Sequence, residues 1–262
     1  MRVMPAMTSE AGQLTYDDAF FDYISLGSRR SAAVVAPWIL KMYPAQSLCD
    51  IGSGRGAWLV EWERAGIKNY LGVDGDYVSV DNLMVPADRF VTRDLTKPFD
   101  LGRTFDLVTS LEVGEHIVPE ATDTYVDNLC RHSDAILFSA ATPGQGGTLH
   151  VNEQRPDFWR DCFGARGYRA FDLVRPKVSG QKQVEPWYRY NTLFFVRGKA
   201  LERLAREAFA SEIKAGDPVP DWSPLAWRAR NAVIRLLPVS VTDRLVEIKH
   251  RYVMARSQGS TG

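Results

Sequence analysis

The sequence has 262 residues, a length that favours one sizeable α/β core with appendages over two full domains. Its 32 basic residues equal its 32 acidic residues, so no overall charge draws the chain to nucleic acid or to an anionic surface. The three cysteines are far apart and show no CxxC spacing, which indicates neither a disulfide framework nor a cysteine zinc site and fits a reducing, cytoplasmic location.

The N-terminal segment is expected to be a helical preface over residues 1–43. Residues 1–15 are small and polar, and residues 16–43 show helical apolar spacing with a break at Gly27. Neither this segment nor any later one contains the roughly 20 consecutive apolar residues that cross a bilayer. We therefore expect a soluble protein without a transmembrane segment.

Residues 44–199 show strand-like apolar runs that alternate with helix-like stretches. Such alternation predicts an α/β, Rossmann-like domain in which helices cover both faces of a mostly parallel sheet. A helix is expected over 119–132, and two late runs, YRAFDLVRP and WYRYNTLFFVRG, are expected to form a closing hairpin. The strand-like runs before that hairpin are SLCDI, NYLGVD, RFVTRD, FDLVTSLE and AILFSA.

Residues 200–262 are expected to form a helical, basic C-terminal extension. The segment GDPVPDWSP reads as a linker, and the stretch from Trp227 to Arg256 contains seven Arg and Lys residues against two acids. This stretch fits an amphipathic helix that packs on the domain, a dimer contact or an interfacial membrane helix.

A glycine-rich segment, DIGSGRG, follows the first strand-like run. Gly52, Gly54 and Ala57 fit the GxGxxG/A pattern, which nicotinamide enzymes also show. Asp50, however, ends a buried strand, where a carboxylate needs a cationic partner. A dinucleotide pyrophosphate would repel it, whereas the ammonium group of S-adenosylmethionine would pair with it. Together with Gly56, this loop therefore predicts an S-adenosylmethionine site.

Two further acids follow the next two strands. Asp74 lies where an acid can accept hydrogen bonds from both ribose hydroxyls. Asp94 is placed to accept from the adenine amino group while the Leu95 amide donates to the ring. Alternatively, Asp74 is a helix N-cap and Asp94 a turn residue, since aspartate favours both places. The three acids in succession favour the cofactor site.

The motifs DIGSGRG, LGVDGD, TRDL and FDLVTSLEVGEHI, in this order, resemble those of class I S-adenosylmethionine-dependent methyltransferases. The resemblance covers about residues 45–198. It implies a seven-stranded sheet whose last strand, WYRYNTLFFVRG, is reversed. It also implies that Glu112 lies beside the methionine or ribose end of the cofactor. Cys49 stands where this family more often has a larger apolar residue, and a buried thiol packs acceptably there.

The EVGEH stretch resembles the ExxEH motif of ubiquinone-type O-methyltransferases and of the RNA 2′-O-methyltransferase that caps small RNAs. In those relatives this motif can hold a divalent cation. The resemblance implies a cation site here that would use Glu112, Glu115, His116 and His150. The alternative is a metal-free enzyme in which the Glu-His pair only shapes the loop, and no metal is assigned.

His116 and His150 are the candidate general bases, since an imidazole can take a proton from a hydroxyl near neutral pH. They belong to the polar segments LEVGEHIVP and GGTLHVNEQ, which we expect to build the acceptor pocket. Aromatic side chains are expected to wall this pocket: Trp187, Tyr188, Tyr16 and Tyr23.

The function expected from these features is methyl transfer to a hydroxyl of a small molecule, such as a sugar or a natural-product intermediate. An N-methyltransferase is the nearest alternative, and a nucleic-acid methyltransferase that uses the basic tail is a second. A third class is a nicotinamide oxidoreductase or a non-catalytic nucleotide binder. The expected partner is a small-molecule acceptor, without nucleic acid, and a homodimer is compatible with the sequence.

Overall fold

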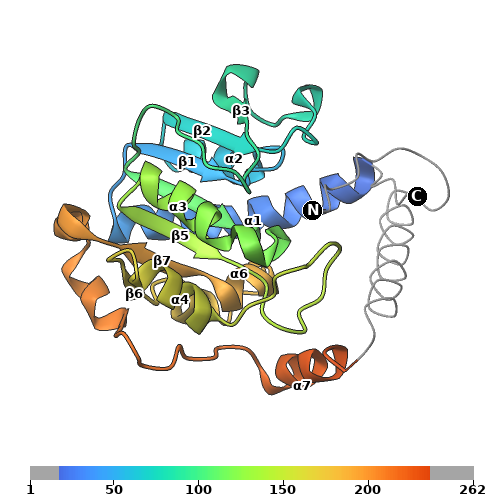
Figure 1. Cartoon of the computed structure of the whole chain (residues 1–262), viewed down its shortest axis with the longest axis vertical. Coiled ribbons are helices and arrows are strands. Elements are labelled where there is room, and N and C mark those ends of the chain that lie inside the picture. Colours follow the sequence, from blue (N-terminus) through green and yellow to red (C-terminus); the bar gives the residue numbers. More distant parts are fainter. Residues whose placement is uncertain (1–17, 237–262) are drawn as a thin grey trace.

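The computed structural model describes residues 18–236, with side chains from residue 25 on, and it places a β-sheet at the centre of this range (Figure 1). Eight strands lie in the order β3-β2-β1-β4-β5-β7-β6-β8. The strands are β1 Ser47–Ile51, β2 Asn69–Asp74, β3 Phe90–Thr92, β4 Leu107–Leu111, β5 Ala135–Ser139, β6 Arg169–Phe171, β7 Leu193–Val196 and β8 Glu212–Ile213.

The first five strands are parallel, and the direction changes at β7. This strand is antiparallel to both of its neighbours, β5 and β6, and β8 is antiparallel to β6. The predicted α/β, Rossmann-like fold with a reversed strand is therefore confirmed. The two-residue strand β8 adds an eighth strand to the seven that the sequence implied.

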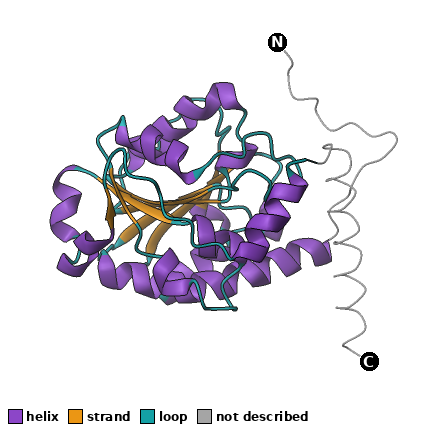
Figure 2. Cartoon of the chain, turned by 90° about the horizontal axis from the view of Figure 1, so that it is seen from below, coloured by secondary structure: helices purple, strands orange, loops and turns teal. Residues whose placement is uncertain are grey.

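Helices cover both faces of the sheet (Figure 2). They are α1 Asp18–Met42, α2 Ala57–Arg64, α3 Thr122–His132, α4 Pro156–Gly164, α5 Arg175–Val178, α6 Pro186–Asn191 and α7 Leu225–Ile234. Because side chains alternate along a strand, Leu48 joins the core under α1 and α2, whereas Cys49 joins the core under α3 and α4. The thiol at position 49 is thus an ordinary core side chain.

The predicted helix break at Gly27 is wrong, because α1 is continuous from Asp18 to Met42. A Cβ at Gly27 would lie 2.7 Å from the Glu185 Oε1 atom. The glycine therefore allows the segment before α6 to approach α1. The close contact with Glu185 therefore explains why a glycine occupies position 27, although glycine has a low helix propensity.

The predicted closing hairpin is only partly correct. Strands β6 and β7 do pair, but α5 and α6 lie between them in the sequence, and the first half of WYRYNTLFFVRG is helical. Pro186 occupies the first turn of α6, where proline is tolerated, and Tyr188 and Asn191 are buried three residues apart, as a helix requires.

After Lys199 the chain forms short 3₁₀ turns, β8 and an irregular segment that leads to α7. Between residues 200 and 236, the expected helical character is therefore limited to those turns and to α7. The rest of the predicted basic extension lies outside the described residues. Within residues 18–236, no helix is long and apolar enough to cross a membrane.

Candidate functional site

The carboxyl ends of the parallel strands bring the predicted cofactor residues to one edge of the sheet. Asp50 on β1 is in register with Gly72 of β2 on one side and with Thr109 of β4 on the other. Asp74 is the last residue of β2. In an open parallel sheet, ligands bind beyond this edge.

The glycine loop between β1 and α2 has a backbone that only glycine adopts readily. Gly52, Gly54 and Gly56 have φ angles of 85°, 52° and 89°. A Cβ at Gly52 would lie 2.2 Å from a methyl group of Val113, so the loop packs directly on the turn that follows β4. A Cβ at Gly54 would have no atom within 4 Å, so open space lies beside this residue.

Asp74 is a buried carboxyl group that holds the glycine loop. Its Oδ2 atom accepts a hydrogen bond from the Gly54 amide at 2.6 Å, and Oδ1 accepts one from the Gly75 amide at 2.7 Å. The hydroxyl of Tyr77 also donates to Oδ1. Burial raises the pKa of Asp74, while these three bonds lower it.

Tyr77 was not identified from the sequence. The residue is 78% exposed, yet its hydroxyl lies against the carboxylate that is predicted to accept from the ribose hydroxyls. The ring also lies over Gly75, where a Cβ would be 2.2 Å from the Tyr77 Cε1 atom. An exposed tyrosine in a polar turn gives no sequence signal that would reveal this contact.

Asp50 is buried and has a hydroxyl as its side-chain partner. The Thr109 hydroxyl donates to its Oδ1 atom at 2.6 Å, and among the described residues Asp50 forms no salt bridge. Burial raises the pKa of Asp50 to about 7, with a further increase from the charge of Asp74. A cationic ligand at this edge would stabilise the ionised carboxylate.

Glu112 follows β4 and is held by two amide side chains. Its Oε2 atom accepts a hydrogen bond from Gln145 at 2.8 Å, and Oε1 accepts one from Asn191 at 3.3 Å. The backbone φ angle of Glu112 is 57°, a strained value for a residue with a side chain. Burial raises the pKa of Glu112, and its hydrogen bonds lower it. Gln145 and Asn191 were not predicted as site residues.

Asp94 and Leu95 lie beyond the end of β3. The Asp94 carboxylate accepts hydrogen bonds from the amide and hydroxyl of Thr96, at 3.0 and 2.6 Å, and forms a salt bridge with Lys97. This is the turn role that the sequence left open for Asp94. The Leu95 side chain is buried. Their adenine contacts stay predictions.

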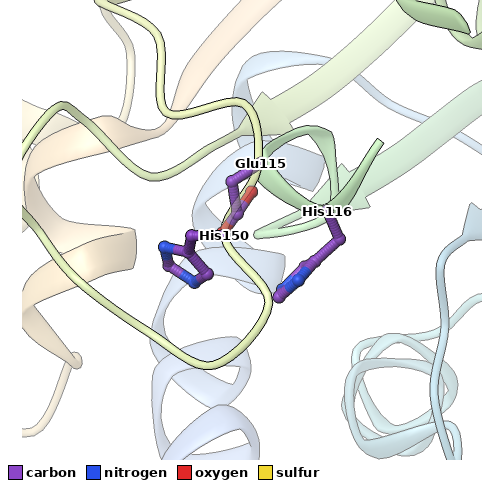
Figure 3. A group of neighbouring side chains, drawn as sticks. All are labelled: Glu115, His116 and His150. Atoms are coloured by element: carbon purple, nitrogen blue, oxygen red, sulfur yellow. The ribbon is translucent and has the colours of Figure 1, made fainter. Parts of the chain in front are cut away.

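Glu115, His116 and His150 converge from the turn after β4 and the loop after β5 (Figure 3). One potential ligand atom from each lies within 4.8 Å of the others. The Glu115 carboxyl is almost fully buried, and its Oε2 atom has no hydrogen-bond partner among the described residues. Burial, followed by the charge of Glu112, raises the pKa of Glu115 well above its usual range. Glu112, the fourth predicted cation ligand, is not part of this group.

The two histidines each use one ring nitrogen. His116 Nδ1 lies 3.2 Å from the Leu149 carbonyl, and His150 Nδ1 lies 2.8 Å from a Glu153 carboxylate oxygen. Because a carbonyl and a carboxylate only accept, both Nδ1 atoms donate, and in the neutral form of each ring the Nε2 atom would present a lone pair. The rings meet edge to face, with centroids 4.9 Å apart.

The surroundings of His116 and His150 differ. Partial burial, followed by the nearby His150, lowers the pKa of His116 to about 4. His150 is fixed through Glu153, whose carboxylate accepts hydrogen bonds from the amides of Gly144 and Gly146 at 2.7 and 2.8 Å.

His132, by contrast, is a structural residue. Its Nδ1 atom lies 2.6 Å from the Asn128 carbonyl, and its Nε2 atom accepts a hydrogen bond from the Leu101 amide at 3.0 Å. With both nitrogens engaged, this ring has no lone pair to offer a substrate.

Among the expected wall residues, Tyr188 is buried and shares a hydrogen bond of 3.0 Å with Ser28 of α1. Its ring also contacts Trp58, at a centroid distance of 5.0 Å. Trp187 packs partly buried against the core beside α1 and α2. Tyr16 and the side chain of Tyr23 lie outside the described residues.

Comparisons with known proteins show where this fold occurs. No protein-family model and no curated protein matches the chain. Among solved structures, an amino pentose methyltransferase with bound S-adenosylmethionine, from Micromonospora echinaspora and involved in calicheamicin biosynthesis, matches 72% of this chain and 100% of its own. The TM-score is 0.52 and the sequence identity is 18%. The chain has the class I methyltransferase fold.

Two other similar structures have lower TM-scores. Magnesium protoporphyrin IX methyltransferase from Synechocystis, also with S-adenosylmethionine bound, is 21% identical, with a TM-score of 0.48, and the match covers 72% of this chain and 87% of that one. For DesVI of Streptomyces venezuelae, the identity is 20% and the TM-score 0.41. That match covers 50% of this chain and only 58% of DesVI.

Proposed function

We propose that this protein is an S-adenosylmethionine-dependent methyltransferase. The observation that carries the proposal is the buried Asp50 carboxyl, which has a hydroxyl partner and no salt bridge among the described residues, at the ligand-binding edge of the sheet. A buried carboxylate needs a cation nearby, and the ammonium group of the cofactor supplies one. The open space at Gly54 and the carboxylate of Asp74 fit the remainder of the cofactor.

Each predicted cofactor residue has a role in this proposal. Asp50 pairs with the ammonium group, Asp74 accepts from the ribose hydroxyls, and Glu112 lies at the methionine or ribose end. The glycine loop allows close approach of the backbone, and Asp94 with Leu95 receives the adenine ring. When bound, the cofactor supplies an electrophilic methyl group.

The acceptor that we propose is a hydroxyl of a small molecule, such as a sugar or a natural-product intermediate. His116 or His150 removes the hydroxyl proton through its Nε2 lone pair. The low pKa of His116 keeps its ring neutral across the physiological range and at the same time makes it a weaker base than an ordinary imidazole. Since an amino pentose methyltransferase shares the fold, a sugar acceptor fits this proposal, with nitrogen as the alternative acceptor atom.

A divalent cation is an optional part of the proposal. Glu115, His116 and His150 offer a carboxylate oxygen and two imidazole nitrogens, a donor set suited to a transition metal. Glu112 is already engaged by Gln145 and Asn191, so a cation would take three protein ligands rather than the four implied by the sequence. The metal-free alternative uses the same histidines as bases.

Calorimetry with S-adenosylhomocysteine tests cofactor binding. Asp74→Ala removes a charged acceptor for two hydroxyls, so its affinity should fall by about 10- to 150-fold, which corresponds to roughly 1.5 to 3 kcal/mol. Asp76→Ala, at an exposed position two residues away, is the matched control and should bind normally. Equal affinity in both variants would place the ribose elsewhere.

Turnover measurements with an identified acceptor test the catalytic assignment. His116→Ala or His150→Ala should lower the rate by roughly a hundredfold while cofactor affinity is kept. EDTA should abolish the activity only if the cation is essential, and Mn²⁺ or Mg²⁺ should then restore it. Near-normal rates in both histidine variants would refute the assignment of a histidine base.

The remaining parts of the proposal concern the partners of the chain. A cytoplasmic enzyme that acts without nucleic acid fits the balanced charge and the cysteine pattern, and a homodimer is compatible with both. Sedimentation and RNA-binding measurements on the full chain test these points directly.

A further inference from the structure

Helix α7, the last helix among the described residues, is joined to the domain by an irregular segment that is firmly anchored. Arg175 is fully buried and forms a two-pronged ion pair with Asp172, at 2.8 Å for both contacts. The same guanidinium donates to the Pro220 carbonyl at 2.9 Å, and the Trp222 indole donates to Asp172 at 2.8 Å. These contacts fix the point from which α7 starts.

Helix α7 then lies against the loop that follows β5 (Figure 1). The Arg230 guanidinium donates to the Gln145 carbonyl at 3.0 Å. A Cβ at Gly144 would lie 2.2 Å from the Asn231 carbonyl oxygen, so the helix backbone and the loop backbone are in direct contact. The ring of Trp227 also contacts Tyr190 of α6, at a centroid distance of 5.8 Å.

The same loop holds two side chains of the candidate site. The Gln145 side chain donates to Glu112 and accepts from Asn191 at 2.9 Å. The amides of Gly144 and Gly146 hold Glu153, which in turn holds His150. The loop thus contacts α7 through Gly144 and Gln145, and the same loop holds Glu112 and His150 of the candidate site.

We infer that α7 is a positioning element of the proposed site, and that Arg230 acts through Gln145 on Glu112 at the cofactor end and through the loop on His150 at the acceptor end. The inference rests on the proposed function, because that proposal makes Glu112 and His150 site residues. It assigns the first part of the basic C-terminal stretch to the site itself and makes Arg230 a positioning residue that need not touch the substrate.

Two arginines on α7 allow a matched test. Arg230 contacts the loop, whereas Arg228 donates to the Ser223 carbonyl and pairs with Asp221, both of which precede the helix. Each substitution, Arg230→Ala or Arg228→Ala, removes one arginine and one charge from the same helix. Hydrogen exchange of the amides in residues 143–153 should become at least threefold faster in Arg230→Ala alone, and Arg230→Lys should recover part of the protection.

A second pair of variants tests the backbone contact. Gly144 and Gly146 both have left-handed φ angles, 85° and 71°, so alanine is strained at either position. Only Gly144→Ala adds a collision with α7, because a Cβ at Gly146 would be 3.8 Å from its nearest neighbour, Ile234. Exchange in the loop should therefore be faster in Gly144→Ala than in Gly146→Ala.

Two outcomes of the exchange experiment would refute the inference, and two further measurements check it. Equal loop exchange in Arg230→Ala and Arg228→Ala would overturn it, and so would faster exchange throughout the chain with a lower melting temperature, which would indicate a merely structural role. The signal of the His150 ring in NMR spectra should move in Arg230→Ala, while that of the buried His132 stays in place. If the wild type fails to bind S-adenosylhomocysteine, the proposed function fails, although the loop comparison still reports on α7.

Discussion

The two halves of the site are built in different ways. The proposed cofactor half is built mainly from the ends of neighbouring strands and the glycine loop, where Asp74 binds the amides of Gly54 and Gly75. The proposed acceptor half depends on contacts between the turn after β4 and the loop after β5, such as that of His116 with the Leu149 carbonyl. The first half therefore follows recognisable strand-end patterns, whereas the second appears only when distant loops meet.

The two halves also differ in how their surroundings shift the pKa of a titratable group. In the cofactor half, burial raises the pKa of an acid, Asp50, to about 7, and in the acceptor half partial burial lowers the pKa of a base, His116, to about 4. Near pH 6 both groups are thus mainly neutral in the free protein. A cationic ligand would restore the charge of Asp50, whereas His116 is already in the form that accepts a proton.

The largest effect is expected where the two halves touch, at Gly52. In Gly52→Ala the new methyl group would collide with Val113, and its φ of 85° would strain any residue other than glycine. The loop should relax away from the collision, and binding must then restore its geometry. Since a clash and a strained φ together cost roughly 3 kcal/mol or more, affinity for S-adenosylhomocysteine should fall by more than about a hundredfold. Calorimetry measures this loss.

Adding Val113→Ala to Gly52→Ala should recover part of the affinity, because the two colliding methyl groups are removed, while a close contact of 3.1 Å with the Cβ of residue 113 and the backbone strain stay. Val113→Ala alone is the control and should bind within a few-fold of the wild type. No recovery in the double variant would mean that the two halves are not in contact through this pair.

The second-largest change is expected from the titration of Asp50. Affinity for S-adenosylhomocysteine should change about tenfold per pH unit below the pKa of this group. Below its pKa of about 7 the group is neutral and cannot pair with an ammonium ion. Affinity for S-adenosylhomocysteine should therefore fall as the pH drops from 7 to 5, and Asp50→Asn should bind weakly with a flat profile. A wild-type profile without this decline would remove Asp50 from the ammonium site.

Titration of Asp50 should change stability in the opposite direction to affinity as the pH rises. The pKa of Asp50 in the folded protein lies above the ordinary value of 3.8, so between pH 4 and 7 the folded state binds a proton that the unfolded state has lost. This group therefore makes the unfolding free energy of the free protein decrease as the pH rises through that window. Denaturant unfolding of wild type and Asp50→Asn at several pH values measures the contribution.

The smallest change in affinity is expected for Tyr77→Phe, and this variant should bind the cofactor more tightly instead of more weakly. The Tyr77 hydroxyl occupies one acceptor atom of Asp74, so it competes with a ribose hydroxyl for the same oxygen. Tyr77→Phe removes this competitor and should tighten cofactor binding by about two- to tenfold, since one hydrogen bond contributes roughly 0.5 to 1.5 kcal/mol. Weaker binding in Tyr77→Phe would show that the hydroxyl assists the cofactor.

The same contrast explains what the sequence could predict. Acids at the ends of strands and a glycine loop are local patterns, so the fold and the positions of Asp50 and Asp74 at the strand ends could be predicted from the sequence, whereas their cofactor roles stay predictions. Predictions from glycine and aromatic residues were wrong where tertiary contacts override propensity. These were the helix break at Gly27 and the strand over the residues that form α6.

The acceptor half was predicted less completely. His116, His150 and Glu115 were identified by their chemistry, and the structure brings them together. Gln145 and Asn191 were missed because neutral amides have no periodicity and show their role only when distant segments meet. The contact of α7 with the loop was missed for the same reason, and the domain boundaries at residues 43 and 199 stay predictions.

The placement of α7 has a consequence for the order in which a new chain matures. The strands from β1 to β5, with the glycine loop and its acids, leave the ribosome before residues 140–236, which contain the acceptor loop, β7 and α7. At ordinary rates of translation that interval is on the order of ten seconds. We therefore expect stalled chains that end before Leu225 to leave the acceptor loop open to protease, and chains released after α7 to protect it. Each new chain would then pass through a stage in which the strands and loop proposed to bind the cofactor have left the ribosome, but the acceptor loop is not yet held by α7.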